Sequence, residues 1–168
     1  MTGILRIPVM KRADALKIAK QLFKKHKLDK RGWTFGFDRA IERQGLCLFL
    51  DKRITISGPL VDRNDEAWVR ELLLHEIAHA LAGQYAGHGP RWKAVCRRIG
   101  AIPQPYGGIP PGSIPPKYIL TCPGCDTTFR RQRVQKGCWC PDCGREKGLL
   151  LVALNPDFKE PGKSPRVA

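Results

Sequence analysis

The stretch that decides this fold reads Trp68-Val-Arg-Glu-Leu-Leu-Leu-His-Glu-Ile-Ala-His-Ala-Leu-Ala82. Its apolar residues cover nearly every side of the helix that it would form, and a helix that is apolar all round is a buried one. His75 and His79 stand four residues apart, so they lie on one helix face and both can reach one metal ion. Glu76, about 100° further round the helix, lies at the flank of that face and can act as a general base without becoming a ligand. This HExxH pattern is typical of zinc peptidases.

An HExxH pattern also occurs by chance, and the alternative is a buried helix whose histidines find ordinary partners. Buried polar groups without partners are costly, and a metal ion would satisfy these side chains. A catalytic zinc usually has three protein ligands. His88 is the only histidine downstream of the pair, and Gly83, Gly87 and Gly89 would let the chain end the helix and turn back. We therefore expect His88 to be the third ligand, with a surface histidine as the alternative.

Composition limits the class of protein. The chain has 168 residues, of which 42% are hydrophobic, as in a globular protein. No apolar run reaches the roughly 18 residues of a membrane span, and the N-terminal residues lack the pattern of a secretory signal. We therefore expect a cytoplasmic protein. In that compartment, seven cysteines indicate metal binding more than disulfides.

The net charge of +15 is concentrated at the two ends of the chain. Residues 1–32 carry a net charge of +8 and residues 117–168 a net charge of +5, whereas residues 33–116 carry only +2. Such a distribution favours a polyanionic partner, most simply nucleic acid. The alternative is a soluble protein that is basic for no functional reason. We expect association with DNA or the nucleoid.

Periodicity on both sides of the HExxH helix predicts a small α+β domain. Residues 12–27 have the apolar stripe of an amphipathic helix. Three short strands follow, at residues 33–37, 46–50 and 53–57, and Asp51-Lys52 would join the last two as a hairpin. Acidic and amide side chains at residues 62–66 cap the HExxH helix, and another helix spans Pro90–Ile99. Prolines and glycines predict a linker at residues 102–116.

A second metal signal lies near the C-terminus, where the sequence reads Cys122-Pro-Gly-Cys125 and later Cys140-Pro-Asp-Cys143. Two CxxC pairs at this separation can meet around one zinc ion. Segments 117–121, 127–133 and 149–153 would supply the strands of a zinc ribbon. Cys138 is one cysteine too many, and it could replace Cys140 as a ligand although it breaks the CxxC spacing.

Basic residues lie beside aromatic ones in the ribbon, and the set comprises Arg130, Arg131, Arg133, Lys136 and Trp139. Arginine and lysine contact phosphates, and exposed rings stack on unpaired bases, so we expect a nucleic-acid surface. The alternative is a solvated strand face. Elsewhere, Cys47 and Cys96 lie in apolar settings and are predicted to be buried thiols. Residues 155–168 are predicted to be disordered.

The order of these motifs resembles that of the SprT-like family, also called Spartan-like. The resemblance rests on HEIAHAL at residues 75–81, GHGPRWK at residues 87–93 and the pair of CxxC motifs, and it covers about Ala13 to Leu151. It implies a minimal zincin-like metallopeptidase domain at residues 1–101, with helices on a three-stranded antiparallel sheet, and a four-cysteine zinc ribbon at residues 117–154. By motif position, the family's metal ligands correspond to His75, His79 and His88, its catalytic glutamate to Glu76, and its ribbon cysteines to Cys122, Cys125, Cys140 and Cys143. Cys138 departs from the pattern.

The resemblance implies a zinc-dependent peptidase, with one catalytic and one structural zinc ion, that degrades proteins crosslinked to DNA. Its partners would be DNA, single-stranded or duplex, and the protein bound to it; we expect a monomer that contacts no membrane. Two other classes stay open. One is a DNA-binding zinc-ribbon protein with a vestigial or regulatory peptidase site, against which the intact Glu76 argues. The other is a zinc peptidase without a nucleic-acid role, against which the ribbon arginines argue.

The expected mechanism leaves two structural questions. Glu76 would take a proton from water and pass it to the leaving nitrogen, while Tyr85 and Arg91 are candidates for the oxyanion donor by their proximity in sequence. The strand Arg53–Ser57 directly precedes the HExxH helix. An edge strand near a metal can pair with an extended substrate, and we predict that this strand is that edge.

Overall fold

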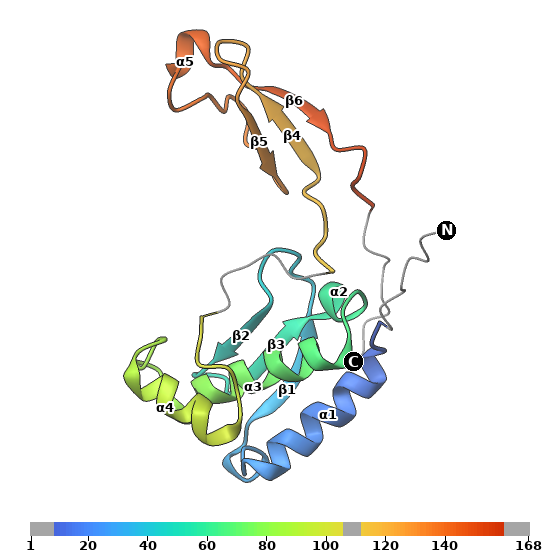
Figure 1. Cartoon of the computed structure of the whole chain (residues 1–168), viewed down its shortest axis with the longest axis vertical. Coiled ribbons are helices and arrows are strands. Elements are labelled where there is room, and N and C mark those ends of the chain that lie inside the picture. Colours follow the sequence, from blue (N-terminus) through green and yellow to red (C-terminus); the bar gives the residue numbers. More distant parts are fainter. Residues whose placement is uncertain (1–8, 106–111, 160–168) are drawn as a thin grey trace, which may run out of the picture. The chain divides into compact units, whose positions relative to one another are not determined.

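The computed structural model describes residues 9–105 and 112–159 (Figure 1). The chain divides into two compact units, Met1–Ser113 and Ile114–Ala168, which we call the N-terminal unit and the ribbon unit. The N-terminal unit contains, in chain order, α1 (Arg12–Lys25), the 3-10 turn η1 (Asp29–Arg31), β1 (Thr34–Asp38), β2 (Gly45–Leu48), β3 (Arg53–Ser57), α2 (Gly58–Val61), α3 (Glu66–Ala82) and α4 (Pro90–Ile99). It is therefore a mixed α+β unit built on a three-stranded sheet.

The strands of this sheet lie in the order β1-β3-β2. β2 and β3 form the predicted antiparallel hairpin, but β1 runs parallel to β3. The prediction of an all-antiparallel sheet is therefore wrong. After β1 the chain crosses to the opposite edge of the sheet, where it forms β2, and the hairpin then brings β3 into the middle. Because β2 runs opposite to β1 and β3 runs opposite to β2, β3 runs parallel to β1. The local sequence encodes the hairpin, but it does not encode which position each strand takes.

This strand order decides which edge is open. β3 is paired on both sides, so the prediction that Arg53–Ser57 is the exposed edge strand is wrong. Within the described residues, β2 pairs with β3 alone. The two edge strands of this sheet are therefore β1 and β2.

Helices α1 and α3 lie side by side over one face of the sheet (Figure 1). The core between these layers includes Leu22 from α1, Ile54 and Ile56 from β3, and Leu73 and Ile77 from α3. Fully burying such a side chain contributes about 1.5–3 kcal/mol. Because α3 is pressed between the sheet, α1 and α4, the HExxH residues that it carries are held at fixed positions.

Both ends of α3 follow local chemistry. Asp65 caps the N-terminus, where its Oδ1 accepts a hydrogen bond from the Trp68 N–H at 2.9 Å; the short helix α2 before it was not predicted. Beyond the C-terminus, Gly83 and Gly87 have φ values of 98° and 47°, a range that favours glycine. They turn the chain back, and α4 begins at Pro90 and packs against α3.

The ribbon unit is a second three-stranded sheet. Its strands β4 (Tyr118–Thr121), β5 (Thr128–Arg131) and β6 (Leu151–Leu154) lie in the order β5-β4-β6 and are all antiparallel, and the short helix α5 spans Gly144–Lys147. The predicted disordered tail begins too early. Asn155 is buried, and its backbone N–H donates to the Lys117 carbonyl at 2.8 Å, while residues 160–168 lie outside the described residues.

The predicted linker is anchored where the structure describes it. The Ile102 N–H donates to Glu71 Oε1 at 2.7 Å, and the Gly112 N–H donates to Asn64 Oδ1 at 2.9 Å. Residues 106–111 lie outside the described residues, so the boundaries of the linker stay a prediction. In the described part of the chain, every helix is too short or too polar to span a membrane.

Candidate functional site

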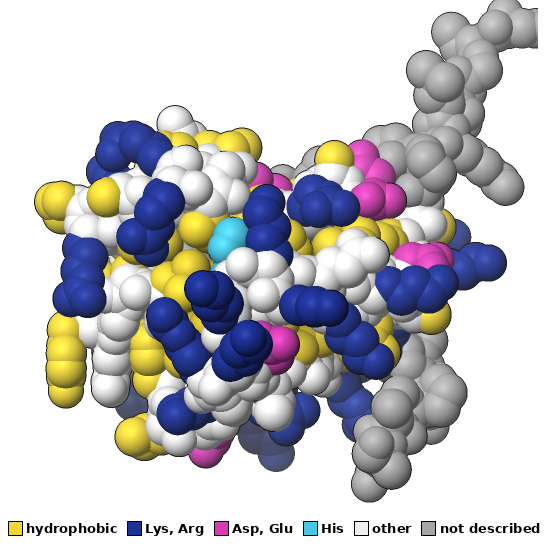
Figure 2. Space-filling view, turned by 90° about the horizontal axis from the view of Figure 1, so that it is seen from below, with side chains coloured by type: hydrophobic (Ala, Val, Ile, Leu, Met, Phe, Trp, Pro, Cys, Tyr) yellow, Lys and Arg dark blue, Asp and Glu magenta, His cyan; other side chains and the backbone are white. Residues whose placement is uncertain are grey.

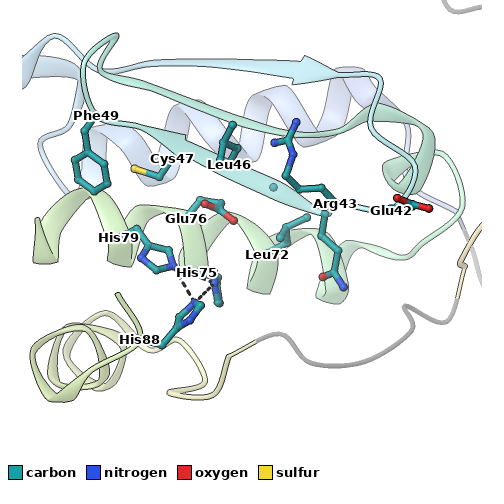
Figure 3. Close-up of a pocket in the computed structure, with 12 residues that line it drawn as sticks. Glu42, Arg43, Leu46, Cys47, Phe49, Leu72, His75, Glu76, His79 and His88 are labelled. Carbon is teal, nitrogen blue, oxygen red and sulfur yellow. Dashed lines mark hydrogen bonds between the residues drawn. The ribbon is translucent and has the colours of Figure 1, made fainter. Parts of the chain in front are cut away.

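Three histidine side chains converge beside α3 (Figure 3). His75 and His79 project from one face of α3, and His88 reaches them from the loop before α4. The Nε2 atoms lie 3.3 Å apart between His75 and His79, 3.1 Å between His79 and His88, and 3.2 Å between His75 and His88. The structure therefore brings together all three histidines that the sequence singled out.

The spacing of these nitrogens fits a metal ion. Zinc binds histidine nitrogen at about 2.0–2.1 Å, which puts the nitrogens of a tetrahedral site about 3.3–3.4 Å apart. Burial lowers the pKa of His75 to about 3 and that of His79 to about 4, and the neighbouring histidines add to both shifts. Neutral imidazole is the form that binds metal. The cluster could therefore hold a zinc ion.

Trp92, on α4, packs against all three histidines of the cluster. Its side chain is fully buried, and its ring centroid lies 4.8 Å from that of His75, 5.3 Å from that of His79 and 4.7 Å from that of His88. Its buried indole N–H makes no hydrogen bond within the described residues, so its contribution is packing. Because one ring contacts all three histidines, it fixes how they face one another. In the sequence, Trp92 is marked only by its place in the GHGPRWK motif, four residues after His88.

Glu76 lies between α3 and β2, with 6% of its surface exposed. Figure 3 shows its side chain reaching from α3 toward β2. Burial raises the pKa of Glu76 to about 7; the positive charge of Arg43 opposes the shift and the negative charge of Asp38 adds to it. Arg43 is ion-paired with Asp38 at 3.0 Å, so its charge is shared. A carboxyl group with a pKa near neutrality is suited to accept and release a proton.

A cavity of about 420 Å³ runs along β2 beside Glu76 and the histidines. Its wall comprises Glu42, Arg43, Gln44, Gly45, Leu46, Cys47, Phe49, Leu72, His75, Glu76, His79 and His88. In Figure 3, Phe49 marks the end near His79, and Glu42 and Arg43 mark the other end. Most of the wall comes from residues 42–49, which no motif marks in the sequence because they reach α3 only through the strand order.

Three predicted side chains do not lie where the sequence suggested. Tyr85 and Arg91, the candidate oxyanion donors, are exposed and do not line the cavity, and Tyr85 is 96% exposed. Cys47 lies in the cavity wall and is half-buried, not fully buried as predicted, whereas Cys96 is fully buried as predicted. Because β2 is an edge strand, it has fewer neighbours than its apolar sequence implies, and Cys47 is left half-buried.

The ribbon unit holds the second predicted cluster. The Sγ atoms of Cys122, Cys125, Cys140 and Cys143 all lie within 4.8 Å of one another, and those of Cys125 and Cys140 are 3.7 Å apart. Zinc–sulfur bonds of about 2.3 Å give a tetrahedral spacing of about 3.8 Å. Cys138 lies outside the cluster, and its thiol donates to the Gln135 carbonyl at 2.9 Å. The structure thus places Cys140, not Cys138, among four sulfurs that could hold a metal ion.

The predicted nucleic-acid residues of the ribbon lie on separate segments of that unit. Arg130 and Arg131 lie exposed on β5, and Arg133 and Lys136 lie exposed in the loop after it. Trp139, 49% exposed, forms an isolated bridge with Leu149 just before β6, and its ring contacts the guanidinium of Arg145 at 5.6 Å. Arg130 and Arg131 are therefore carried by β5, whereas Trp139 lies in a segment that pairs with the chain just before β6.

One face of the N-terminal unit is also basic. Figure 2 shows that Lys and Arg side chains surround a histidine that reaches the surface, with far fewer Asp and Glu side chains on this face. Such a surface has a positive potential that attracts polyanions.

Comparison with known proteins agrees with this geometry. The SprT-like family model matches residues 12–113, more than half of the chain and nearly all of the N-terminal unit, and ends before the ribbon. Searches of curated proteins and of solved structures gave no match. The matched region contains the three histidines, Glu76 and the cavity along β2. Residues 12–113 are thus a metallopeptidase-like domain, and the chain belongs to the SprT-like family.

Proposed function

We propose that this chain is a zinc-dependent metallopeptidase, with a zincin-like N-terminal unit, that cleaves proteins bound or crosslinked to DNA. The observation that carries the peptidase part is the convergence of three Nε2 atoms, 3.1–3.3 Å apart, beside the buried Glu76. Family membership supports the same reading. The DNA part rests on the distribution of positive charge.

In this proposal, each group of the site has a separate task. His75, His79 and His88 hold one zinc ion. The chemistry that zinc supplies when bound is Lewis-acid polarisation of the scissile carbonyl and of water. Glu76 takes a proton from water at its carboxylate and gives it to the leaving nitrogen. Its pKa of about 7 makes both steps accessible near neutral pH.

The open edge of β2 gives substrate a place to bind. The Ser57 N–H donates to the Gln44 carbonyl at 2.7 Å, so these residues form a hydrogen-bonded pair of the ladder. Such pairs alternate along antiparallel strands. The backbone groups of Gly45 and Cys47 therefore point away from β3, toward the open edge. An extended substrate could add to β2 as a further strand, which selects weakly for side chains.

Positive charge supports DNA as the partner. The net charge is +15 with the excess at both ends of the chain, and the arginines of β5 are exposed. A peptidase held on DNA meets proteins on the same DNA at high effective concentration. Weak side-chain selectivity at the cleft then suits varied substrates, because the DNA and not the cleft brings them to the enzyme.

Cleavage of a basic DNA-binding protein, with and without DNA, tests the proposal. We expect the wild type to cleave it faster with DNA, and Glu76→Gln and chelated wild type to be inactive. Cleavage that survives either treatment contradicts the peptidase assignment. A rate that DNA leaves unchanged favours the second candidate, a zinc peptidase without a nucleic-acid role, which is also consistent with a family match that ends before the ribbon.

A salt series locates the DNA contacts. Each phosphate that a side chain neutralises releases counterion, so affinity falls with salt. Changing Arg130, Arg131 and Arg133 to Ala should flatten the slope of log affinity against log salt by up to about three units if all three contact phosphates. Fluorescence anisotropy with single-stranded and duplex oligonucleotides measures the slope. A wild-type slope in the triple variant assigns DNA binding to the N-terminal lysines or removes it.

A further inference from the structure

Gly45 opens strand β2 at the point where Glu76 approaches the sheet. Glycine weakens a strand and often marks the close approach of another group. Gly45 is not among the glycines with positive φ, so its backbone conformation is one that any residue can adopt. The reason for glycine here is therefore space.

The space is taken up by the side chain of Glu76. A Cβ atom added to Gly45 would lie 2.6 Å from Glu76 Oε1 and 2.9 Å from both Cδ and Cγ. Contacts below 3.0 Å are essentially absent for real Cβ atoms, so something would have to move. Three successive atoms of one buried side chain are involved, and rotating the carboxylate alone does not relieve them. The whole side chain would have to shift away from β2.

We propose that Gly45 is a positioning residue for Glu76. Because Gly45 has no side chain, the Glu76 side chain can lie directly against β2, and we call the space that it occupies there the seat of Glu76. The backbone N–H and C=O of the same residue face the open edge of the strand. One residue thus sets the distance between the base and a substrate paired with β2. The catalytic consequence rests on the proposed peptidase function, whereas the seat itself is a packing property that can be tested without cleavage.

The sheet offers a matched control in Gly36, on β1. A Cβ atom added there would lie 2.7 Å from Arg53 Nη2, nearly as close as the 2.6 Å contact at Gly45. Arg53 is exposed, and the atom concerned is the far end of a flexible side chain that can swing into solvent. Gly36→Ala therefore makes the same chemical change in the same sheet without disturbing a buried group.

A double-mutant cycle on the full-length, zinc-loaded chain tests the seat. We expect Gly45→Ala to lower the thermal unfolding midpoint by roughly 5 °C, as overpacking does, and Gly36→Ala to change it little. In a Glu76→Ala background the obstructing Cγ, Cδ and Oε1 atoms are gone, so Gly45→Ala should then have almost no effect. An equal drop in both backgrounds overturns the proposal.

Steady-state kinetics separate positioning from damage to the strand. Moving a catalytic group by about 1 Å lowers the rate about 10²-fold, so Gly45→Ala should lower kcat on that scale with KM nearly unchanged and zinc content equal to that of the wild type. An unchanged kcat with a raised KM means that Gly45 serves only the strand edge, and the proposal fails. If the wild type cleaves nothing, the proposed function fails, and the thermal cycle still decides whether Gly45 seats Glu76.

Discussion

Removing Trp92 should loosen the histidine cluster without touching a ligand. Its fully buried ring has its centroid 4.7–5.3 Å from those of all three histidines. Truncating a buried aromatic residue to Ala typically costs about 3–5 kcal/mol, a large share of the roughly 5–15 kcal/mol that stabilises a domain. We expect Trp92→Ala to lose stability on that scale. We also expect zinc affinity to fall about 10–100-fold, as when a group that supports metal ligands is removed.

Trp92→Phe is the matched, milder change. Because the indole N–H makes no hydrogen bond within the described residues, Phe leaves no polar group unsatisfied and removes only volume. Its effects should therefore lie between those of the wild type and Trp92→Ala. Urea unfolding of the chelated variants gives the stability change, and competition with a chromophoric chelator gives the zinc affinity, with the four-cysteine cluster as an internal reference. If Trp92→Ala binds zinc as tightly as the wild type, the histidines keep their geometry unaided and the reasoning is refuted.

Three further outcomes are expected. Changing both His75 and His79 to Ala should lower the zinc content from two ions per chain to one, because the cysteine cluster is separate; elemental analysis measures it, and one ion in the wild type would contradict the histidine site. His88→Ala should abolish cleavage while the fold and the ribbon zinc remain; near-normal turnover would show that His88 is not a necessary ligand. The pKa of Glu76 is raised from 4.5 to about 7 in the fold, so its ionisation opposes folding increasingly as pH rises through that interval. The stability of metal-free Glu76→Gln relative to the wild type should therefore be greater at pH 8 than at pH 5, by up to about 3 kcal/mol, and an equal difference at both pH values in urea unfolding would contradict the raised pKa.

The features that the sequence predicts correctly are those that local chemistry decides. Asp65 caps α3 through the N–H three residues on, and Pro90 and Gly100 begin and end α4. Each signal acts within one or two turns of the chain. The spacing of His75 and His79 follows directly from the helix that these signals define, so two of the three histidines of the metal cluster could be placed before any tertiary contact was known.

The position of β3 could not be predicted because the alternation in its sequence indicates which face is solvated and not which strands lie beside it. Ile54 and Ile56 alternate with polar residues, which is the pattern of a strand with one solvated face. In the structure Thr55 and Ser57 are buried, because Thr55 Oγ1 donates to Asp38 Oδ2 at 2.8 Å and the Ser57 hydroxyl donates to the Ala40 carbonyl. Both partners come from the β1 end of the sheet. The polar residues thus mark contacts with a neighbouring segment, not exposure to water.

The same strand order explains which site residues the sequence missed. Gly45 and Arg43 influence Glu76 across an interval of about thirty residues that no helical or strand period spans. Their identity is informative only once β2 is known to lie over α3. From the sequence alone, a glycine at the start of an apolar strand indicates only a weaker strand. In the structure, the close approach of Glu76 gives a second reason for a glycine at this position.

The two clusters differ in the number of coordination positions that they leave open, which is the property that distinguishes a catalytic metal site from a structural one. Four sulfur donors fill a tetrahedral zinc site, whereas three nitrogens leave one position for a reacting group. Among the described residues, no other potential ligand joins the three histidines in their cluster. Glu76, the proposed acid–base group, lies with the histidine cluster, because it lines the same cavity as the three histidines. Under the proposed function, hydrolysis therefore belongs to the N-terminal unit, and zinc in the ribbon would hold together the sheet that carries the exposed arginines of β5.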